Sequence, residues 1–127
     1  MLNKNERMEK LNNAGINTGK YFTVNLPEGL AKNSTITLSI NENADPDVQT
    51  DLSRIMDGLV REGEPYYDHT IEGLDDMPAH AKSSLFGVSL TIPITNGRLN
   101  LGTWQGIYLC EFRNNGGERK IVATIYG

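Results

Sequence analysis

Alternating apolar and polar residues predict about six strands along the chain, because successive side chains of a strand point to opposite faces. The alternating segments cover residues 21–26, 35–41, 88–94, 99–101, 105–112 and 119–126. Asn96 and Gly97 form a strong two-residue hairpin signal between the third and fourth of these segments. The run Asn-Asn-Gly-Gly at 114–117 predicts a second hairpin that joins the last two segments.

Two longer helices are predicted between the strands. The first is expected over 45–60, where apolar residues recur every three or four positions and form one stripe: Val48, Leu52, Ile55 and Leu59. Asp45 is placed to cap this helix, Pro46 suits its first turn, and we expect the stripe to face a core. A second helix is expected over 77–86 with Asp76 as its cap, and a short marginal helix over 6–13.

Two helices with mostly antiparallel strands define an α+β fold, in which the helices pack on a sheet or on a sandwich of two sheets. The length of 127 residues favours a single domain that spans 1–127. The chain contains neither Gly-x-Gly-x-x-Gly after a strand nor a Gly-x-x-x-x-Gly-Lys-Ser/Thr loop. A parallel nucleotide-binding fold with one of these phosphate loops is therefore excluded.

Charge and hydropathy narrow the range of partners. The 12 Lys and Arg residues against 16 Asp and Glu give a net charge of −4, which argues against a nucleic-acid partner. No apolar run reaches the length of a secretory signal or a membrane span, so we expect a cytoplasmic protein without a membrane partner.

The acidic residues are concentrated in one part of the chain. Eleven of them lie within 41–76 together with two bases, so this segment carries a net charge of −9 and the other residues carry +5. Such a block either gathers a divalent cation or forms a solvated acidic face.

The segment 66–84 concentrates the candidate chemistry, because it contains both histidines of the chain. His69 and His80 lie there among several charged residues, namely Asp68, Glu72, Asp75, Asp76 and Lys82. Histidine suits proton transfer near neutral pH, and a neighbouring carboxylate orients its ring. Histidine with carboxylate also suits Zn²⁺ or a similar divalent metal, whereas Mg²⁺ takes oxygen ligands and is often brought by a phosphorylated ligand. The alternative is a loop histidine at 69 and an exposed helical histidine at 80.

Lys82, Ser83 and Ser84 lie in the early turns of the second predicted helix, where free N–H groups favour a phosphate or a carboxylate. Helical spacing places Lys82 on a different face from His80, so the two side chains share a site only if the helix end is distorted or the ligand is large. The alternative for Lys82 is a solvated surface lysine.

Two features of the C-terminal half have competing interpretations. Trp104 and Gln105 either line a ligand pocket or contribute packing at the end of a strand. Cys110 is the only cysteine, which excludes an intramolecular disulfide, and its apolar strand favours a buried, inert thiol over a reactive nucleophile.

Four segments of the sequence resemble the YjbQ-like family. They are INENADPDV at 40–48, DHTIEGLDDMPAHAKSSLFG at 68–87, LTIPITNGRLNLGTWQGIYLCEF at 90–112 and KIVATIYG at 120–127. The resemblance implies an α+β fold with strands in two packed sheets and two or three helices, assembled as a homotrimer. Some members are described as secondary thiamine-phosphate synthases, which join a pyrimidine pyrophosphate to a thiazole phosphate and release pyrophosphate.

The resemblance also implies a set of site residues. Asp76, His80 and Lys82 match the polar cluster of the family and are the expected catalytic residues. Other recurring positions, together with Ser83 and Ser84, are the expected ligand-binding residues: Asn41, Glu42, Asn43, Asp45, His69 and Gln105. His69 and His80 are the expected metal ligands. The expected ligand is a small phosphorylated molecule, with Mg²⁺, Zn²⁺ or another divalent metal as cofactor.

A mechanism consistent with these residues places the leaving pyrophosphate on Lys82 and on the N–H groups of the second helix. Asp76 or Asp45 would hold a magnesium ion beside the pyrophosphate. His80 would move a proton or donate a hydrogen bond to a phosphate.

The N-terminal segment 1–34 departs from the family pattern. Members usually carry His-Thr-Thr or His-Thr-Ser before the strand that leads into Asn-Glu-Asn-Ala-Asp, and here Asn33, Ser34 and Thr35 occupy that place. No histidine precedes His69 in the sequence. The chain is therefore either a thiamine-phosphate-synthase-type transferase or a non-catalytic, trimeric ligand-binding or assembly protein that has lost a family histidine.

Overall fold

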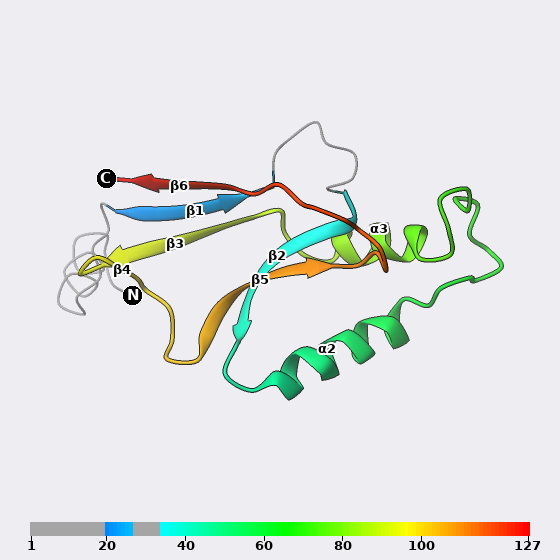
Figure 1. The fold of residues 1–127 in the computed structure, drawn as a ribbon, viewed down its shortest axis with the longest axis horizontal. Coiled ribbons are helices and arrows are strands. Elements are labelled where there is room, and N and C mark those ends of the chain that lie inside the picture. The colour runs from blue at the N-terminus through cyan, green and yellow to red at the C-terminus, as the bar shows by residue number, and fades with distance from the viewer. Residues whose placement is uncertain (1–19, 27–33) are drawn as a thin grey trace, which may run out of the picture.

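A computed structural model describes residues 20–26 and 34–127, which form two helices and two antiparallel sheets (Figure 1). The strands are β1 (Tyr21–Asn25), β2 (Ile36–Glu42), β3 (Ser89–Thr95), β4 (Arg98–Leu99), β5 (Gln105–Glu111) and β6 (Val122–Tyr126). The helices are α2 (Pro46–Leu59) and α3 (Asp76–Ser84). The predicted α+β class is confirmed. The helix predicted over 6–13 and the position of Asn33 lie outside the described residues.

The first predicted hairpin is confirmed. Asn96 and Gly97 join β3 to β4 with φ angles of 51° and 73°, and Ile94 lies opposite Leu99. Positive φ at both central residues is the signature of the tight turn that matches strand twist, and Asn-Gly adopts it most readily. The partner strand is shorter than predicted, because β4 ends at Leu99.

The second predicted hairpin is wrong. β5 pairs with β2 from Ile36 opposite Glu111 to Glu42 opposite Gln105, and β6 pairs with β1 in the other sheet. The four-stranded sheet has the order β4-β3-β1-β6, and β2 with β5 forms the second sheet. After β5, Arg113 and Asn114 bind Asp75 near the start of α3, and the chain then continues to β6 in the other sheet.

The core lies between the two sheets. Val24 of β1 and Leu26 pack with Ile36 and Leu38 of β2, and Phe22, Leu90 and Ile107 cover this group from the neighbouring strands. One backbone hydrogen bond ties the two sheets together beside the core, from the Leu38 N–H of β2 to the Gly87 carbonyl before β3. Another, from the Leu26 N–H to the Val88 carbonyl, extends the pairing of β1 with β3. Burial of these apolar side chains supplies the main stabilising free energy of the sheet pair.

α2 begins as predicted but does not face a core. The Asp45 side chain accepts a hydrogen bond of 2.9 Å from the Asp47 N–H, and Pro46 is the first helical residue. In the described part of the chain, however, none of the α2 residues is buried, and Ile55 and Leu59 are 60% and 66% exposed. The expectation that the apolar stripe faces a core of this chain is therefore wrong, because helical spacing reports an apolar face and not what covers it.

A cleft of about 470 Å³ separates α2 from the sheet of β2 and β5. Leu52 and Met56 line it from the helix, and Tyr108 and Cys110 line it from β5. In Figure 1 the helix runs along the lower edge of the molecule, beside this strand pair. Cys110 is a free thiol that is only partly buried, since this face of β5 borders the cleft, so the prediction of a buried thiol is wrong.

α3 starts one residue earlier than predicted and ends at Ser84 instead of 86. Asp75 occupies the cap position, so the prediction that Asp76 caps the helix is wrong. The Asp76 carboxylate is instead turned inward and only 2% exposed. Among the described residues, neither helix has the length and apolar character that a bilayer crossing requires.

Candidate metal centre

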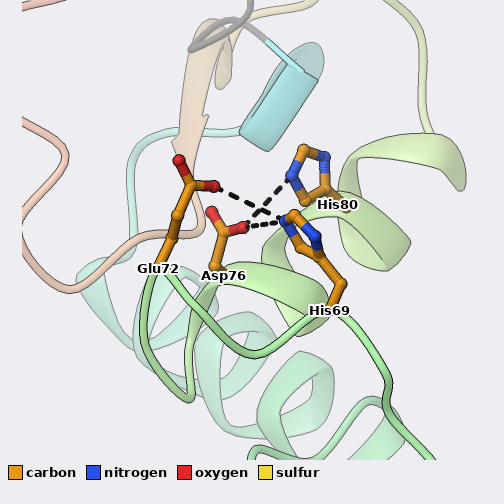
Figure 2. A group of neighbouring side chains, drawn as sticks. All are labelled: His69, Glu72, Asp76 and His80. Atoms are coloured by element: carbon orange, nitrogen blue, oxygen red, sulfur yellow. Dashed lines mark hydrogen bonds and ion pairs between the residues drawn. The ribbon is translucent and has the colours of Figure 1, made fainter.

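Four titratable side chains converge where the loop after α2 enters α3 (Figure 2). His69 and Glu72 lie on the loop, and Asp76 and His80 lie on α3. Asp76 and His80 are four residues apart and therefore share one face of the helix. The loop turns back at Gly73, whose φ of 113° suits a residue without a Cβ, and this turn carries His69 and Glu72 to that face.

One oxygen of Asp76 is the centre of this cluster. Its Oδ2 lies 2.7 Å from His69 Nε2 and 3.3 Å from His80 Nε2, and Glu72 Oε2 lies 3.5 Å from His69 Nε2. One ligand atom from each of the four residues lies within 4.8 Å of all the others. The two imidazole rings meet edge to face with centroids 5.4 Å apart. The sequence spacing between the histidines is unusual for metal ligands, but the fold brings the rings into contact.

Arg113, which follows the end of β5, binds the other oxygen of Asp76. Its Nη1 donates to Asp76 Oδ1 at 2.5 Å. Burial alone raises the pKa of Asp76, but the hydrogen bond from His69 and the positive charge of Arg113 outweigh it, so this pKa lies below its ordinary value. Asp76 is therefore a carboxylate, ready to accept hydrogen bonds or a cation.

Asp75 belongs to the same network but faces away from the histidines. Arg113 Nε donates to Asp75 Oδ2 at 3.0 Å, and the Asn114 N–H donates to the same oxygen at 2.8 Å. The Arg113 guanidinium and this backbone N–H hold the pKa of Asp75 below its ordinary value. The start of α3 is thus fastened to the end of β5 by charge-assisted hydrogen bonds.

Two imidazoles and two carboxylates are a donor set for Zn²⁺ or a similar transition ion, which takes nitrogen and oxygen ligands at four positions. Mg²⁺ prefers oxygen ligands and keeps several waters, so two imidazole nitrogens suit it poorly. Asp76, His69 and His80, all predicted from the sequence, come together here. Glu72 completes the group.

Lys82 lies apart from this cluster. Its ammonium is held by Asp57 of α2, with Nζ 2.7 Å from Oδ1, and its side chain is only 5% exposed. Lys82 and Asp57 line the cleft under α2, whereas His69 lines a separate cavity of about 230 Å³ beside the loop. The different helical faces expected for Lys82 and His80 are thus seen, and the interpretation of Lys82 as a solvated surface lysine is wrong.

The two serines of α3 bind neighbouring backbone. The Ser83 hydroxyl donates to the carbonyls of His80 and Ser34, and the Ser84 hydroxyl donates to the Ala81 carbonyl. Ser34 Oγ also lies 3.3 Å from His80 Nδ1. Ser34, the first described residue after the gap at 27–33, therefore lies beside the cluster.

The residues predicted around β2 mainly connect β2, α2 and β5. The Asn43 side chain accepts from Gln49 of α2 at 3.1 Å, while Asn41 lines the cleft. The Tyr108 hydroxyl donates to the Glu42 carbonyl. Asn43 also presses against β5, since a Cβ at Gly106 would lie 2.8 Å from the Asn43 Cβ. None of these contacts reaches His69 or His80, and Asp45 serves as the cap of α2.

Trp104 lies in the turn before β5, and Gln105 is the first residue of that strand. Gln105 Oε1 accepts a hydrogen bond of 2.7 Å from the Gly102 N–H, which shapes the turn. Trp104 is 67% exposed, so it does not pack in a core of the described chain. Neither residue lines the cleft or the cavity beside His69.

Arg113 is the contributor that local sequence did not reveal. It stands outside the acidic segment and carries no motif. Charge was the available signal. Two adjacent acids at the start of a helix, Asp75 and Asp76, need a positively charged partner once they are buried. Most Lys and Arg residues lie outside the acidic segment 41–76, so such a partner was to be sought there. Glu72 was visible as a neighbour of His69, at the i+3 position.

The fold and this cluster together define a small α+β protein with a histidine–carboxylate site suited to a divalent metal. The sequence model of the family described as "UPF0047 protein YjbQ-like" matches residues 9–127, and the chain belongs to this family. The UPF0047 protein YjbQ of Salmonella typhimurium is 50% identical over 98 residues, which cover 77% of this chain and 70% of that protein. A Synechocystis UPF0047 protein is 49% identical over 96 residues, covering 76% and 65%.

The solved structures agree with the family assignment. The crystal structure of an uncharacterized YjbQ/UPF0047 protein from Clostridium acetobutylicum matches 92% of this chain and 82% of its own, with 38% identity and a TM-score of 0.69. The resemblance inferred from the four sequence segments is thus confirmed. Family membership establishes the fold but not the activity.

Proposed function

We propose that the chain is a metal-assisted transferase that acts on small phosphorylated molecules, of the thiamine-phosphate-synthase type that the family resemblance implies. One observation carries the proposal: His69, Glu72, Asp76 and His80 each offer a ligand atom within 4.8 Å of the others. Two nitrogens and two carboxylate oxygens at this spacing favour Zn²⁺ or a similar ion over Mg²⁺.

The charge of the cluster supports a cation between protein and substrate. Glu72 and Asp76 would repel a phosphate that approached them directly. These carboxylates and the two imidazoles would hold a divalent ion, which would supply positive charge beside a leaving pyrophosphate. The residues of this chain supply the position and the orientation of the site, and they exclude water on the side of Asp76, which is nearly buried.

This proposal changes two roles in the mechanism inferred from sequence. His80 presents Nε2 to Asp76 while its Nδ1 lies by Ser34 Oγ, which suits a ligand held by a second hydrogen bond more than a proton carrier. Lys82 fastens α3 to α2 through Asp57, so the phosphate is assigned to the cluster and not to Lys82.

The experiment measures metal binding and catalysis on the same samples. Purified protein is titrated with Zn²⁺ and with Mg²⁺ by calorimetry, then assayed for thiamine phosphate formation from the pyrimidine pyrophosphate and the thiazole phosphate. We expect Zn²⁺ to bind more tightly than Mg²⁺, and His80→Ala to weaken Zn²⁺ binding and lower turnover by about 100-fold. The matched control is Asp51→Asn, an exposed acid of α2.

The outcomes separate the two parts of the proposal. Parental Zn²⁺ affinity in a folded His80→Ala protein would reject the assigned ligands. A protein that binds Zn²⁺ but forms no thiamine phosphate would retain the metal site and reject the transferase, in favour of the non-catalytic ligand-binding alternative.

We further propose that the chain assembles as a homotrimer. The support is the number of large apolar side chains left open to solvent in the described chain, including Ile55 and Leu59 on α2 and Ile125 and Tyr126 on β6. Light scattering measures the mass: three times 14.1 kDa is expected, and a 14.1 kDa species at micromolar concentration would contradict the trimer.

A further inference from the structure

With one guanidinium, Arg113 binds two residues of the metal cluster, Glu72 and Asp76, and the neighbouring Asp75. Nη1 donates to Asp76 Oδ1 at 2.5 Å, Nη2 donates to the Glu72 carbonyl at 2.9 Å, and Nε donates to Asp75 Oδ2 at 3.0 Å. The side chain comes from the segment after β5, whereas its partners lie 37 to 41 residues earlier in the chain. The planar fork of arginine suits such simultaneous contacts, and the point charge of lysine does not.

Because of this contact, the two oxygens of the Asp76 carboxylate have different partners. Its Oδ1 is occupied by Arg113, and its Oδ2 lies beside both imidazoles (Figure 2). Without Arg113, rotation of the carboxylate would exchange the two oxygens. Arg113 also fixes the backbone of Glu72, whose side chain then reaches His69.

The charges of the same group balance around a divalent ion. Glu72, Asp75 and Asp76 carry three negative charges when ionised, and Arg113 carries one positive charge. A divalent cation bound by neutral imidazoles brings this group to zero net charge. Either a lost guanidinium or a lost cation leaves the site anionic.

We propose that Arg113 is a positioning residue for the metal site: it presents Asp76 Oδ2 and Glu72 to the ion and so sets the affinity and the coordination geometry. The inference rests on the proposed function, because it needs a metal at the cluster. Partners of this kind, one layer outside the ligands, typically change metal affinity by about 10- to 100-fold when they are removed.

The chain offers a matched control. Arg119 is a nearly buried arginine that, like Arg113, pairs with a carboxylate: Nε and Nη2 donate to the two oxygens of Glu111, both at 2.8 Å. It touches none of the four cluster residues in these contacts. Arg119→Met therefore removes a comparable ion pair without touching the proposed metal ligands.

The test titrates Co²⁺, followed by its visible absorption, and Zn²⁺, by competition with a chelator, into the parent, Arg113→Lys, Arg113→Met and Arg119→Met. We expect Zn²⁺ to bind about 10- to 100-fold more weakly to Arg113→Met, with an altered Co²⁺ spectrum. Arg113→Lys should lose part of the affinity, since the N–H groups of a single ammonium nitrogen cannot reproduce the planar fork of the guanidinium. Arg119→Met should keep the parental affinity and spectrum, although it unfolds more easily.

A second measurement uses the metal-free protein. In the parent, the imidazole nitrogens of His69 and His80 give ¹⁵N signals that report the contact with Asp76, and Arg113→Lys should shift both while Arg119→Met leaves them in place. If Arg113→Met fails to fold, Arg113→Lys and Asp75→Asn supply the same comparison. Asp75→Asn weakens the hold on the guanidinium without altering a proposed ligand.

The results separate this inference from the function on which it rests. A parent that binds neither Zn²⁺ nor Co²⁺ overturns the metal site and the role of Arg113 with it. A parent that binds both ions, with unchanged affinity, spectrum and imidazole signals in folded Arg113 variants, overturns the positioning role alone and leaves the metal site intact.

Discussion

The two helices of the described chain are held in opposite ways. α3 is fixed at its start by a polar network, in which Arg113 and Asn114 bind Asp75 and Asp76, and it buries Pro78 and Ala79. α2 buries none of its residues within the described chain. In the described chain, its main polar contacts with other segments are the ion pair of Asp57 with Lys82 and the hydrogen bond of Gln49 with Asn43.

The difference shows what determines the position of a helix. Buried charges require partners at defined places, so the network at α3 specifies one arrangement of loop, helix and strand end. An apolar stripe requires only some apolar surface, which another chain can supply as well as the helix's own chain. We therefore expect mutations at the start of α3 to change both stability and metal binding, and mutations on α2 to have smaller effects on the fold.

Asp76→Asn should have the largest effect. It keeps the volume but removes the charge between Arg113 and the two histidines, so it leaves the guanidinium less well paired in a nearly buried place. We expect a loss of about 3 kcal/mol in the free energy of unfolding, because the buried Asp76 side chain loses its charge-assisted hydrogen bonds with both Arg113 and His69. Urea denaturation measures this change, and calorimetry with Zn²⁺ should show the loss of tight binding.

The control for Asp76→Asn is Asp51→Asn, the same change at an exposed acid of α2. It should alter the free energy of unfolding by less than about 0.5 kcal/mol. Equal effects of the two substitutions would contradict the contrast between the helices.

The two partners of the ion pair between α2 and α3, Asp57 and Lys82, should differ in how much their replacement lowers stability. Asp57→Ala leaves the Lys82 ammonium nearly buried without the carboxylate that holds it, and should cost about 2 kcal/mol. Lys82→Met removes the charge together with its need for a partner, and should change the free energy of unfolding by less than about 1 kcal/mol. Urea denaturation of both variants and of the double variant measures the coupling. If Lys82→Met were the more damaging change, or if it weakened Zn²⁺ binding, Lys82 would have a role beyond this tie.

The cap of α2 should give a smaller, local effect. Asp45→Ala removes the acceptor for the Asp47 N–H and should cost about 1 kcal/mol of stability. Asp47→Ala, which removes only a favourable charge near the helix start, should cost about 0.5 kcal/mol. Hydrogen exchange of the first-turn amides checks the assignment, since protection should fall mainly in Asp45→Ala. Equal protection in both variants would mean that the cap contributes no more than the charge.

Local signals in the sequence predicted the elements well, and contacts between distant segments remained hidden. Alternation and Asn96-Gly97 predicted the strands and the first hairpin because both act within a few residues. β5 pairs with β2, a strand much earlier in the chain, and the residues that follow it, Arg113 and Asn114, bind Asp75. No local sequence pattern contains these long-range contacts. For the same reason His69 and His80 were visible as candidates by residue type, whereas the oxygen of Asp76 that joins them, and the arginine that orients it, required the fold.

The smallest effect on the fold is expected from Ile55→Ser with Leu59→Ser, on the exposed stripe of α2. Since both side chains are more than half exposed in the described chain, their replacement should change the free energy of unfolding of a dissociated chain by less than about 0.5 kcal/mol. If the stripe is covered by another copy in the proposed trimer, the same double change should lower the mass seen by light scattering and make thermal stability less dependent on protein concentration. Ile36→Ala, at a fully buried position of β2, is the reference and should cost about 3 kcal/mol at every concentration. A loss of comparable size from the α2 double variant, independent of concentration, would mean that the stripe is buried within its own chain and that the two helices are not held in different ways.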